Sequence, residues 1–296
     1  MAHTCFPTQS KSESRPKAGA ANKSKPQPAP SPEQVAIMQW TVRMGAVTAE
    51  ALADREGVSV PSARARLGVL EKAEWLSRKR LLAKQPALYT VTRAGLRASG
   101  LRGLDPCRVS ASNAHHLIVC AAVAAALERC YPDHRVLGER ELRRDERERG
   151  VQLASARLGI GPDGGPLLHR PDLVLWPEAS AGEDGEGLAV AVEVELTIKA
   201  PRRLTDICRA WARCRTIAGV LYIAPLEVQR ALERAIAQAQ AQKQIVAIGF
   251  DALPGMVGIL GGAVETAPKQ MSATVSAMAS EQPSEQPSES TVPSDA

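Results

Sequence analysis

Aromatic side chains are scarce in this sequence, since Phe, Trp and Tyr together make up 3% of its 296 residues. A packed core must therefore be built from Leu, Val, Ile and Ala, and the 44% hydrophobic content is enough to supply one. Long apolar runs are also missing. The longest, at residues 117–127, has about half the ~20 residues that a membrane-spanning helix needs, so we expect no membrane association.

Cysteine patterns of known types are absent as well. The six cysteines form no CxxC pair and have no spacing typical of a disulfide framework. Residues 1–31 contain no apolar stretch like that of a signal peptide. These features argue against the secreted, disulfide-rich class, and we expect a cytoplasmic protein with reduced thiols.

The composition changes along the chain and divides it into four parts. Residues 1–31 are rich in Pro, Ser, Lys and Ala and predict a disordered basic arm, whereas residues 266–296 repeat Ser, Glu, Gln and Pro and predict a disordered acidic tail. The remaining length accommodates two modest domains. We place a first domain at residues 32–104 and an α/β domain at residues 112–252.

The first domain carries a concentrated positive charge. Between Arg64 and Arg102, ten Lys and Arg residues are interrupted by two Glu residues, so this stretch has a net charge of +8 (ten minus two), against +5 for the whole chain. Such a field suits the phosphate backbone of a nucleic acid. A solvated basic face with no partner would have the same composition.

The basic stretch belongs to a helix-helix-helix-hairpin pattern. Ser31 before Pro32 predicts the start of a first helix, and further helices are expected at residues 48–56 and 60–72. Two short strands joined by a basic turn follow at residues 75–81 and 88–91, before a short helix capped by Thr92. In a winged helix-turn-helix of this order, the third helix enters the major groove and the hairpin touches the backbone.

Residues 48–53 and the ending Tyr-Thr-Val-Thr-Arg-Ala-Gly at residues 89–95 resemble bacterial winged-helix DNA-binding modules. Winged helices also serve as protein-docking modules, but the basic helix and hairpin favour double-stranded DNA as the partner. The predicted DNA contacts are Ser62, Arg64, Arg66, Arg78, Lys79, Arg80 and Lys84.

The second domain alternates helices and strands, which predicts a mixed sheet with covering helices. Asn113 is expected to cap its first helix, and residues 143–166 are expected to be an irregular insertion. The predicted strands are residues 135–142, 167–176, 188–198, 219–224 and 245–250, and the later predicted helices are residues 202–215 and 227–242.

Three carboxylates interrupt otherwise apolar strands of this domain, namely Asp172, Glu193 and Glu195. A strand repeat of two puts Glu193 and Glu195 on one face, about 7 Å apart. Because an unpaired buried charge is costly, a divalent cation such as Mg²⁺ or Mn²⁺ between Asp172 and Glu193 would explain them. The metal would support phosphodiester hydrolysis. Salt bridges to Arg140, Arg170 or Arg202, without catalysis, are the alternative.

This layout resembles the PD-(D/E)XK nuclease superfamily in element order and in the spacing from Pro-Asp to Glu-x-Glu. The resemblance implies that Asp172 and Glu193 bind metal, and it places Glu195 at the catalytic position where Lys is usual. Lys199 lies on the same strand face, but we expect it to be ~13 Å away. Arg202 and Arg203, at the start of the next helix, are candidate phosphate contacts.

Other polar residues are weaker candidates for this site. Glu139 and Glu141 share a face of a predicted strand, so either of them, or Glu128, would supply an additional acid. His116 and Cys120 have the i, i+4 spacing of a zinc-binding pair, but no second ligand pair is recognisable, so a packed histidine is the simpler interpretation. His169 precedes Asp172 and would either reach the site or begin a strand.

Most of the folded region also resembles the replication-relaxation family. The likeness rests on the winged-helix segment, His115-His116, residues 139–144, Arg-Pro-Asp at 170–172 and Ala-Val-Glu-Val-Glu-Leu-Thr-Ile-Lys-Ala at 191–200. It implies a role in replication or transfer of bacterial plasmids and other mobile elements, with other replication or transfer proteins as partners. Three hypotheses follow: a DNA-binding plasmid protein, a metal-dependent endonuclease, and a transcriptional regulator whose α/β domain mediates homodimer or partner contacts.

Overall fold

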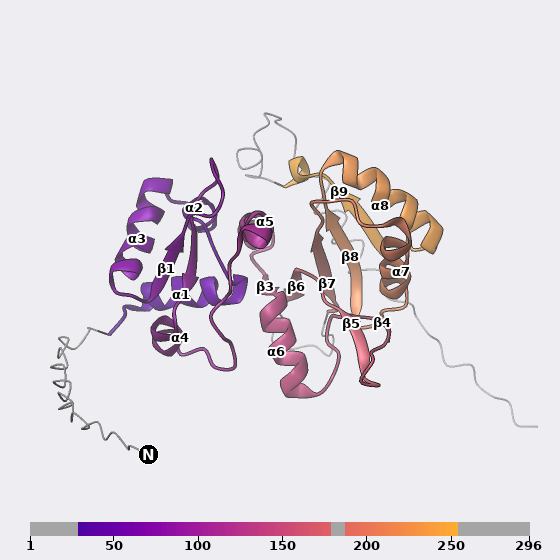
Figure 1. The fold of residues 1–296 in the computed structure, drawn as a ribbon, viewed down its shortest axis with the longest axis horizontal. Helices are drawn as coiled ribbons and strands as arrows, with labels where there is room; N and C mark the ends of the chain where they lie inside the picture. Colours follow the sequence, from indigo (N-terminus) through magenta and orange to yellow (C-terminus); the bar gives the residue numbers. More distant parts are fainter. Residues whose placement is uncertain (1–28, 179–186, 254–296) are drawn as a thin grey trace, which may run out of the picture.

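The computed structural model describes residues 29–178 and 187–253. Almost all of the predicted basic arm and the whole predicted acidic tail lie outside these residues. The described chain has mixed α and β structure, with a helical unit and hairpin first and a five-stranded mixed sheet second (Figure 1).

The N-terminal unit follows the predicted order of three helices and a hairpin. Its elements are α1 (Pro32–Met44), α2 (Ala49–Glu56), α3 (Val60–Lys72), β1 (Leu76–Lys79), β2 (Leu88–Val91) and α4 (Arg93–Ser99). Local caps explain the boundaries. The side chain of Ser31 accepts the Gln34 N–H in a capping box, and Gly57 ends α2 in the left-handed conformation. The predicted order of these elements is confirmed, and β1 is shorter than the strand expected at residues 75–81.

The hairpin is joined to the helices through β2 and through Trp75, the residue before β1. Leu76 pairs with Val91 in the antiparallel ladder, and Val47 exchanges two backbone hydrogen bonds with Tyr89, at 3.0 and 2.8 Å. At the start of α4, a Cβ on Gly95 would lie 2.1 Å from the Trp75 carbonyl oxygen. Only glycine fits this close approach, which fixes α4 against the beginning of the hairpin.

The long helix α5 (Ala111–Cys130) connects the two halves of the molecule. Residues 118–127 are all buried, and many are alanines that allow close approach of neighbouring helices. Trp40 of α1 donates to Glu128 of α5 at 3.1 Å, and one hydrophobic cluster runs from α1 through α5 to the sheet. Ser110 is the N-cap of α5, and the predicted cap Asn113 instead lies at N3, where it accepts the Ser110 N–H at 2.8 Å.

The sheet of the second half has the strand order β3-β6-β7-β8-β9. Its first three strands pair antiparallel and its last three pair parallel. The strands are β3 (His134–Gly138), β6 (Leu173–Pro177), β7 (Ala189–Val194), β8 (Ile217–Ile223) and β9 (Ile245–Ile248), and the helices beside them are α6 (Glu139–Arg149), α7 (Pro201–Ala212) and α8 (Leu226–Ala239). A short 3₁₀ turn, η1 (Phe250–Ala252), follows β9.

Alternate residues of the strands face two different cores. On β7, Val190 and Val192 belong to the cluster that contains α5, whereas Ala189 and Ala191 pack in the cluster that contains α7 and α8. The sheet is therefore covered by α5 on one side and by α7 and α8 on the other (Figure 1). Glu193 follows the same alternation and points to the α7 side.

Several predicted strand boundaries are wrong. The strand expected at residues 135–142 ends at Gly138, and α6 begins at Glu139, so Glu139 and Glu141 lie on a helix. The expected irregular insertion contains most of α6 and all of β4 (Ala156–Ile160), which forms a hairpin with β5 (Pro166–His169). The strand expected at residues 167–176 is interrupted before β6, and β7 ends at Val194 rather than continuing to residue 198.

Candidate functional site: two carboxylates, two histidines and a lysine

Asp172 lies at the break between β5 and β6, where its side chain is fixed from two sides. Its Oδ2 accepts the Val194 N–H at 2.8 Å, and its Oδ1 lies 2.9 Å from Nε2 of His116 on α5. Its backbone carbonyl accepts the Glu139 N–H at 2.9 Å. Asp172 is thus held at the place where α5, α6 and β7 meet the beginning of β6.

Glu193 is buried in β7, with 7% of its side chain exposed. Its Oε1 lies 2.7 Å from Nε2 of His169 at the end of β5, although the pair is not aligned as a hydrogen bond. The His169 ring in turn packs edge-on against Trp211 of α7, with the ring centroids 5.6 Å apart. Burial raises the pKa of Glu193, and the nearby charge of Asp172 raises it further, against the opposing effect of His169.

Lys199 returns to the carboxylates, contrary to the ~13 Å separation expected for an extended strand. Because β7 ends at Val194, the chain bends before α7 and the Lys199 ammonium contacts the Glu195 carboxylate. Burial lowers the pKa of Lys199, while the charges of Glu193 and Asp172 oppose that shift. The ammonium is therefore electrostatically coupled to all three carboxylates predicted for the site.

His116 and Cys120 of α5 lie beside Asp172. Sγ of Cys120 lies 3.3 Å from Nε2 of His116. The potential metal-ligand atoms of Asp172, His116 and Cys120 all lie within 4.8 Å of one another. The hydrogen bond with Asp172 raises the pKa of His116, although burial opposes this. The i, i+4 spacing already indicated the His-Cys pair. Asp172 was missed as its partner because it is more than 50 residues away in sequence.

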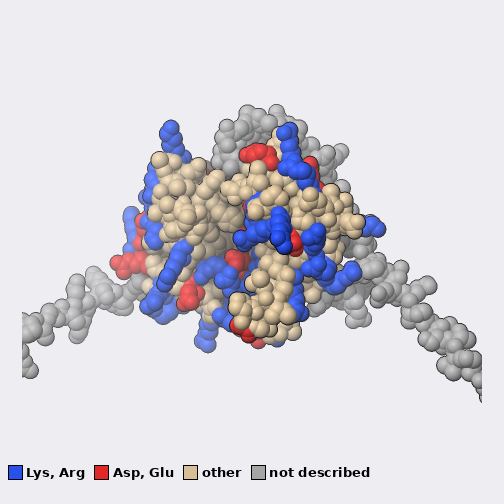
Figure 2. Space-filling view, turned by 45° about the vertical axis from the view of Figure 1, so that its right-hand side comes forward, with Lys and Arg blue, Asp and Glu red and all other residues tan. Residues whose placement is uncertain are grey.

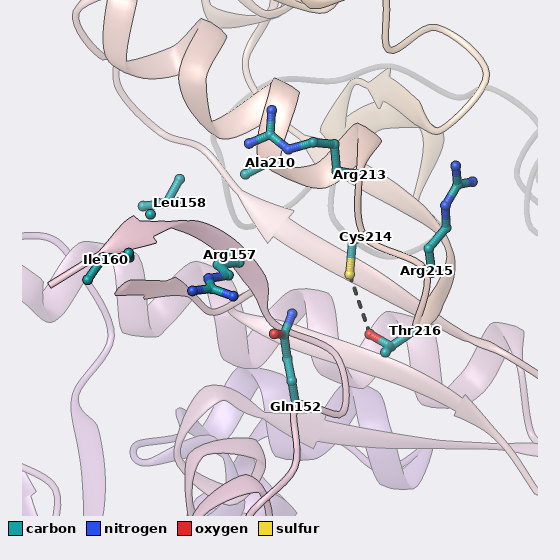
Figure 3. A pocket seen from close by; sticks show the side chains of 10 residues that line it. Gln152, Arg157, Leu158, Ile160, Ala210, Arg213, Cys214, Arg215 and Thr216 are labelled. Atoms are coloured by element: carbon teal, nitrogen blue, oxygen red, sulfur yellow. Dashed lines mark hydrogen bonds between the residues drawn. The ribbon is translucent and has the colours of Figure 1, made fainter. Parts of the chain in front are cut away.

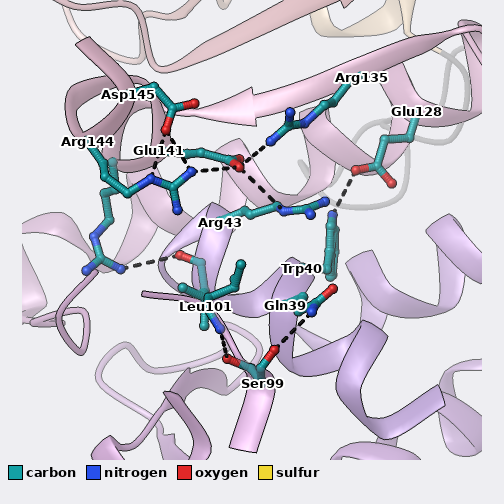
Figure 4. Close-up of polar contacts among 12 residues, drawn as sticks. Gln39, Trp40, Arg43, Ser99, Leu101, Glu128, Arg135, Glu141, Arg144 and Asp145 are labelled. Carbon is teal, nitrogen blue, oxygen red and sulfur yellow. Dashed lines mark hydrogen bonds and ion pairs between the residues drawn. The ribbon is translucent and has the colours of Figure 1, made fainter. Parts of the chain in front are cut away.

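The additional acids suggested from the sequence do not join this group. Glu141 is 1% exposed and lies against three arginines, with Arg43 at 3.7 Å, Arg144 at 3.5 Å and Arg135 in closer contact (Figure 4). Its role is to tie α6 to α1. Glu139 pairs with Arg143 on its own helix, and Glu128 binds Trp40 and Arg55.

The arginines suggested as purely structural partners of the carboxylates have other contacts. Arg170 pairs with Glu146 at 3.1 Å, and Arg140 donates to the Val42 carbonyl at 3.4 Å. Arg202 is exposed near the start of α7. Among the described residues, the side chains of Asp172, Glu193 and Glu195 contact two histidines, a backbone N–H and Lys199.

The basic residues predicted to contact DNA are divided by the structure into two groups. Arg64 on α3 is 54% exposed and lies 3.5 Å from Glu50, and the hairpin residues Arg78, Lys79, Arg80 and Lys84 are exposed. Arg66 is different, because it pairs with Glu56 at 2.7 Å and Glu33 at 2.8 Å. Ser62 is half-buried in the first turn of α3.

A second basic surface runs along α7 and was only partly predicted. Two hollows of about 480 and 520 Å³ adjoin there and share Leu158 and Arg213 in their walls. Arg157 of β4 and residues 213–216 at the end of α7 line the first hollow (Figure 3), and Lys and Arg side chains are prominent on this face in Figure 2. The arginines of both hollows are Arg157, Arg202, Arg203, Arg209, Arg213 and Arg215, with Asp206 the acid in their lining.

Only Arg202 and Arg203 of this α7 groove were singled out from the sequence. Arg209 and Arg213 follow Arg202 at seven and eleven residues, which is a helical repeat that could have indicated one arginine-bearing face. Arg157 could not have been included, because it comes from a hairpin expected to be irregular.

Comparisons with known proteins found no relative of this chain. No family model matches it, and no curated protein or solved structure is significantly similar to it. Among the helices of the described residues, none combines the length and the apolar character needed to cross a bilayer.

Proposed function

We propose that this protein binds double-stranded DNA through a winged helix at residues 32–104 and hydrolyses a phosphodiester of that DNA at a metal site in a PD-(D/E)XK-like domain at residues 112–252. The observation that carries the proposal is the arrangement at the end of β7, where Asp172 accepts the Val194 N–H directly after Glu193 and Lys199 pairs with Glu195. Two candidate hard-ion ligands and one cation therefore belong to the same end of the sheet.

DNA binding is supported by the exposed basic residues of α3 and the hairpin. α3 packs its apolar side through Ala63, Leu67 and Leu70, so Arg64 and Lys72 remain on the outer side. Arg64, Arg78, Lys79, Arg80 and Lys84 would contact phosphates or base edges. Arg66 has two carboxylate partners and would instead position α3 relative to α1 and α2.

Hydrolysis is supported by the donor atoms of Asp172, before β6, and of Glu193, in β7. The buried Oε1 of Glu193 has no aligned hydrogen bond, and Asp172 retains lone pairs beyond those used by Val194 and His116. Oxygen donors of this kind fit Mg²⁺ or Mn²⁺. A bound ion of this class would lower the pKa of a water and neutralise charge on the scissile phosphate.

Lys199 would take the catalytic place that the resemblance to the PD-(D/E)XK superfamily gave to Glu195. The charges of Glu193 and Asp172 act on its ammonium, and its lowered pKa favours proton exchange at a developing oxyanion. Glu195 would hold the Lys199 side chain in position through their ion pair. Glu195 then acts through Lys199 rather than on the substrate.

The α7 groove would hold the DNA backbone beside this site. The groove lining includes Ala200, the residue after Lys199, and Arg203, whose charge lowers the pKa of the Lys199 ammonium, so the groove would begin beside Lys199. The arginines farther along α7 continue the positive surface to Arg215. Phosphate contacts of this kind orient a duplex without reading its sequence.

A DNA-binding regulator without nuclease activity is the second candidate, favoured by the histidines on both carboxylates. His116 and His169 can neutralise Asp172 and Glu193 when protonated, which would stabilise the site without a metal. In either case we propose that the DNA belongs to plasmids or other mobile elements, where further replication or transfer proteins or a second copy of the chain would be partners.

A titration of labelled duplex DNA by fluorescence anisotropy at several salt concentrations tests the DNA-binding proposal. The triple variant R78A/K79A/R80A should bind more weakly and lose up to about three units of salt slope, since each phosphate contact contributes about 0.9. R143A/R147A/R149A on α6 removes the same charge elsewhere and is the matched control. Equal weakening by both variants would contradict a specific role for the hairpin.

A further inference from the structure

We propose that His116, Cys120 and Asp172 form a binding site for a thiophilic divalent cation of the Zn²⁺ class. This site shares Asp172 with the proposed hydrolytic site, but it uses a thiol and an imidazole that hard Mg²⁺ does not require. The inference does not depend on DNA cleavage, because it concerns only the ligand atoms present and can be tested without DNA.

Two of the three separations between the donor atoms are close to those around a tetrahedral ion, and the third is within 4.8 Å. Nε2 of His116 lies 3.3 Å from Sγ of Cys120 and 2.9 Å from Oδ1 of Asp172. With metal–ligand bonds of about 2.0–2.3 Å, tetrahedral zinc would separate a nitrogen from a sulfur by about 3.6 Å and from an oxygen by about 3.3 Å. An expansion of about 0.3–0.4 Å, within the range of a rotamer adjustment, would therefore admit the ion.

The protein holds all three groups in place. His116 and Cys120 lie one turn apart on α5, whose following residues are buried. Asp172 is oriented by the Val194 N–H on its other carboxylate oxygen, which is the kind of outer contact that fixes metal ligands. These supports come from α5 and β7, so they do not depend on a flexible loop.

Cys120 points at its partners from a buried position. Cys120 is 8% exposed, and its thiol lies against the His116 ring. The ring itself is 39% exposed, which leaves an access route and room for a water as fourth ligand. Three protein ligands and one open position are the arrangement of catalytic zinc sites.

Metal binding at this site should release a proton from Cys120. Burial holds the pKa of the thiol well above its ordinary value, and the negative charges of Asp172, Glu193 and Glu139 raise it further. His116 must also be neutral to act as a ligand, and its pKa is raised by Asp172. Apparent affinity should consequently increase with pH, because the ion competes with protons on both groups.

Titration of the full-length, metal-free protein with Co²⁺ tests the site by absorption spectroscopy. Cobalt substitutes for zinc, and a cobalt–thiolate bond produces an intense near-ultraviolet charge-transfer band that oxygen and nitrogen ligands do not. We expect this band in the wild type and its loss in C120S. C130S on the same helix and C5S, outside the described residues, are matched controls that should retain it.

Competition with Zn²⁺ supplies a second measurement for variants that retain the fold. H116Q alters a partly exposed side chain, so folding should be preserved, and we expect Zn²⁺ affinity to fall at least about 100-fold, since even outer contacts of metal ligands are worth 10- to 100-fold. The proposal would be overturned by any of three results: no charge-transfer band in the wild type, a band that persists in C120S, or unchanged Zn²⁺ affinity in H116Q. The three residues would then be a hydrogen-bonded His–Asp pair with a packed thiol.

Discussion

Asp172 divides its two carboxylate oxygens between His116 and Val194. Oδ1 lies 2.9 Å from the His116 ring on α5, and Oδ2 accepts the backbone N–H of Val194 on β7 at 2.8 Å. One side chain therefore connects the long central helix to the strand that carries Glu193. Changes at His116, Asp172 or Glu193 should consequently affect stability as well as chemistry, with different dependence on pH.

The His116–Asp172 pair should stabilise the fold more in acid than in base. The pKa of His116 is raised in the folded state, so the folded protein binds the proton more tightly than the unfolded chain. The added stability is complete below the ordinary histidine pKa of 6.5 and is lost as pH rises through the higher folded pKa. Urea unfolding should show a larger deficit for H116Q at about pH 5.5 than at about pH 8.5.

H115Q is the control for this comparison, because His115 is the exposed neighbour on the same turn of α5. As an exposed substitution, it should leave the free energy of unfolding close to that of the wild type. A deficit for H116Q that does not change with pH would contradict the assigned ion pair.

Replacing Glu193 by Gln should stabilise the protein while removing a metal ligand. The raised pKa of Glu193 means that the folded state holds its proton above the ordinary value of 4.5, so the buried carboxylate lowers stability as pH rises through that window. E193Q should increase the free energy of unfolding by about 1 kcal/mol near neutral pH and by less near pH 4.

Urea unfolding at both pH values measures the effect of E193Q. Glu227 on α8 is exposed, so E227Q is a matched control that should leave stability unchanged. Destabilisation by E193Q near neutral pH would indicate that the His169 contact outweighs the desolvation of the carboxylate.

Glu141 should stabilise the contact between the two halves of the protein. Its carboxylate is 1% exposed and lies among Arg43 of α1, Arg135 of β3 and Arg144 of α6. E141A would leave these guanidinium groups without a shared partner, at a cost of about 2–3 kcal/mol, less than for a fully buried pair because the arginines reach solvent. E148A, at an exposed position of the same helix, should cost little.

Differential scanning calorimetry of E141A and E148A measures this contribution. The expected result is a clear decrease in the unfolding temperature for E141A, accompanied by a tendency of the two halves to unfold separately. Equal unfolding temperatures for the two variants would show that hydrophobic contacts through α5 are sufficient to hold the halves together.

The N-terminal unit could be predicted almost residue by residue because its boundaries are local. Ser31, Thr48 and Thr92 accept backbone N–H groups from within their own first turns, and Gly57 ends α2 by its left-handed conformation. Such caps are determined by short segments of sequence and do not depend on distant residues.

Boundaries in the α/β half depended on distant contacts and were harder to predict. Residues 135–142 alternate like a strand, but the chain turns at Gly138, where a Cβ would lie 2.3 Å from the Arg43 carbonyl oxygen of α1. The same limit applies to the site. Asp172 and Glu193 were identified by their charge within apolar strands, whereas Lys199 and His116 join them only through the end of β7 and the packing of α5.

Lys199 should be more important for DNA cleavage than for metal binding. K199M keeps the length of the side chain without its charge, and we expect cleavage to fall about 100-fold or more, as for loss of a group that acts on a developing charge. Mn²⁺ affinity, measured by calorimetry, should change much less. K243M at an exposed position is the control, and a large loss of Mn²⁺ affinity in K199M would assign the lysine a structural role.

Nicking of supercoiled plasmid in Mg²⁺ or Mn²⁺ tests the central claim most directly. The substitutions D172N and E193Q change the two proposed ligands without changing their size, and circular dichroism can verify that both variants are folded. We predict metal-dependent nicking by the wild type and by E227Q, and none by D172N or E193Q. Intact plasmid with the wild type in both metals, or equal nicking by all four proteins, would contradict the proposed hydrolytic site.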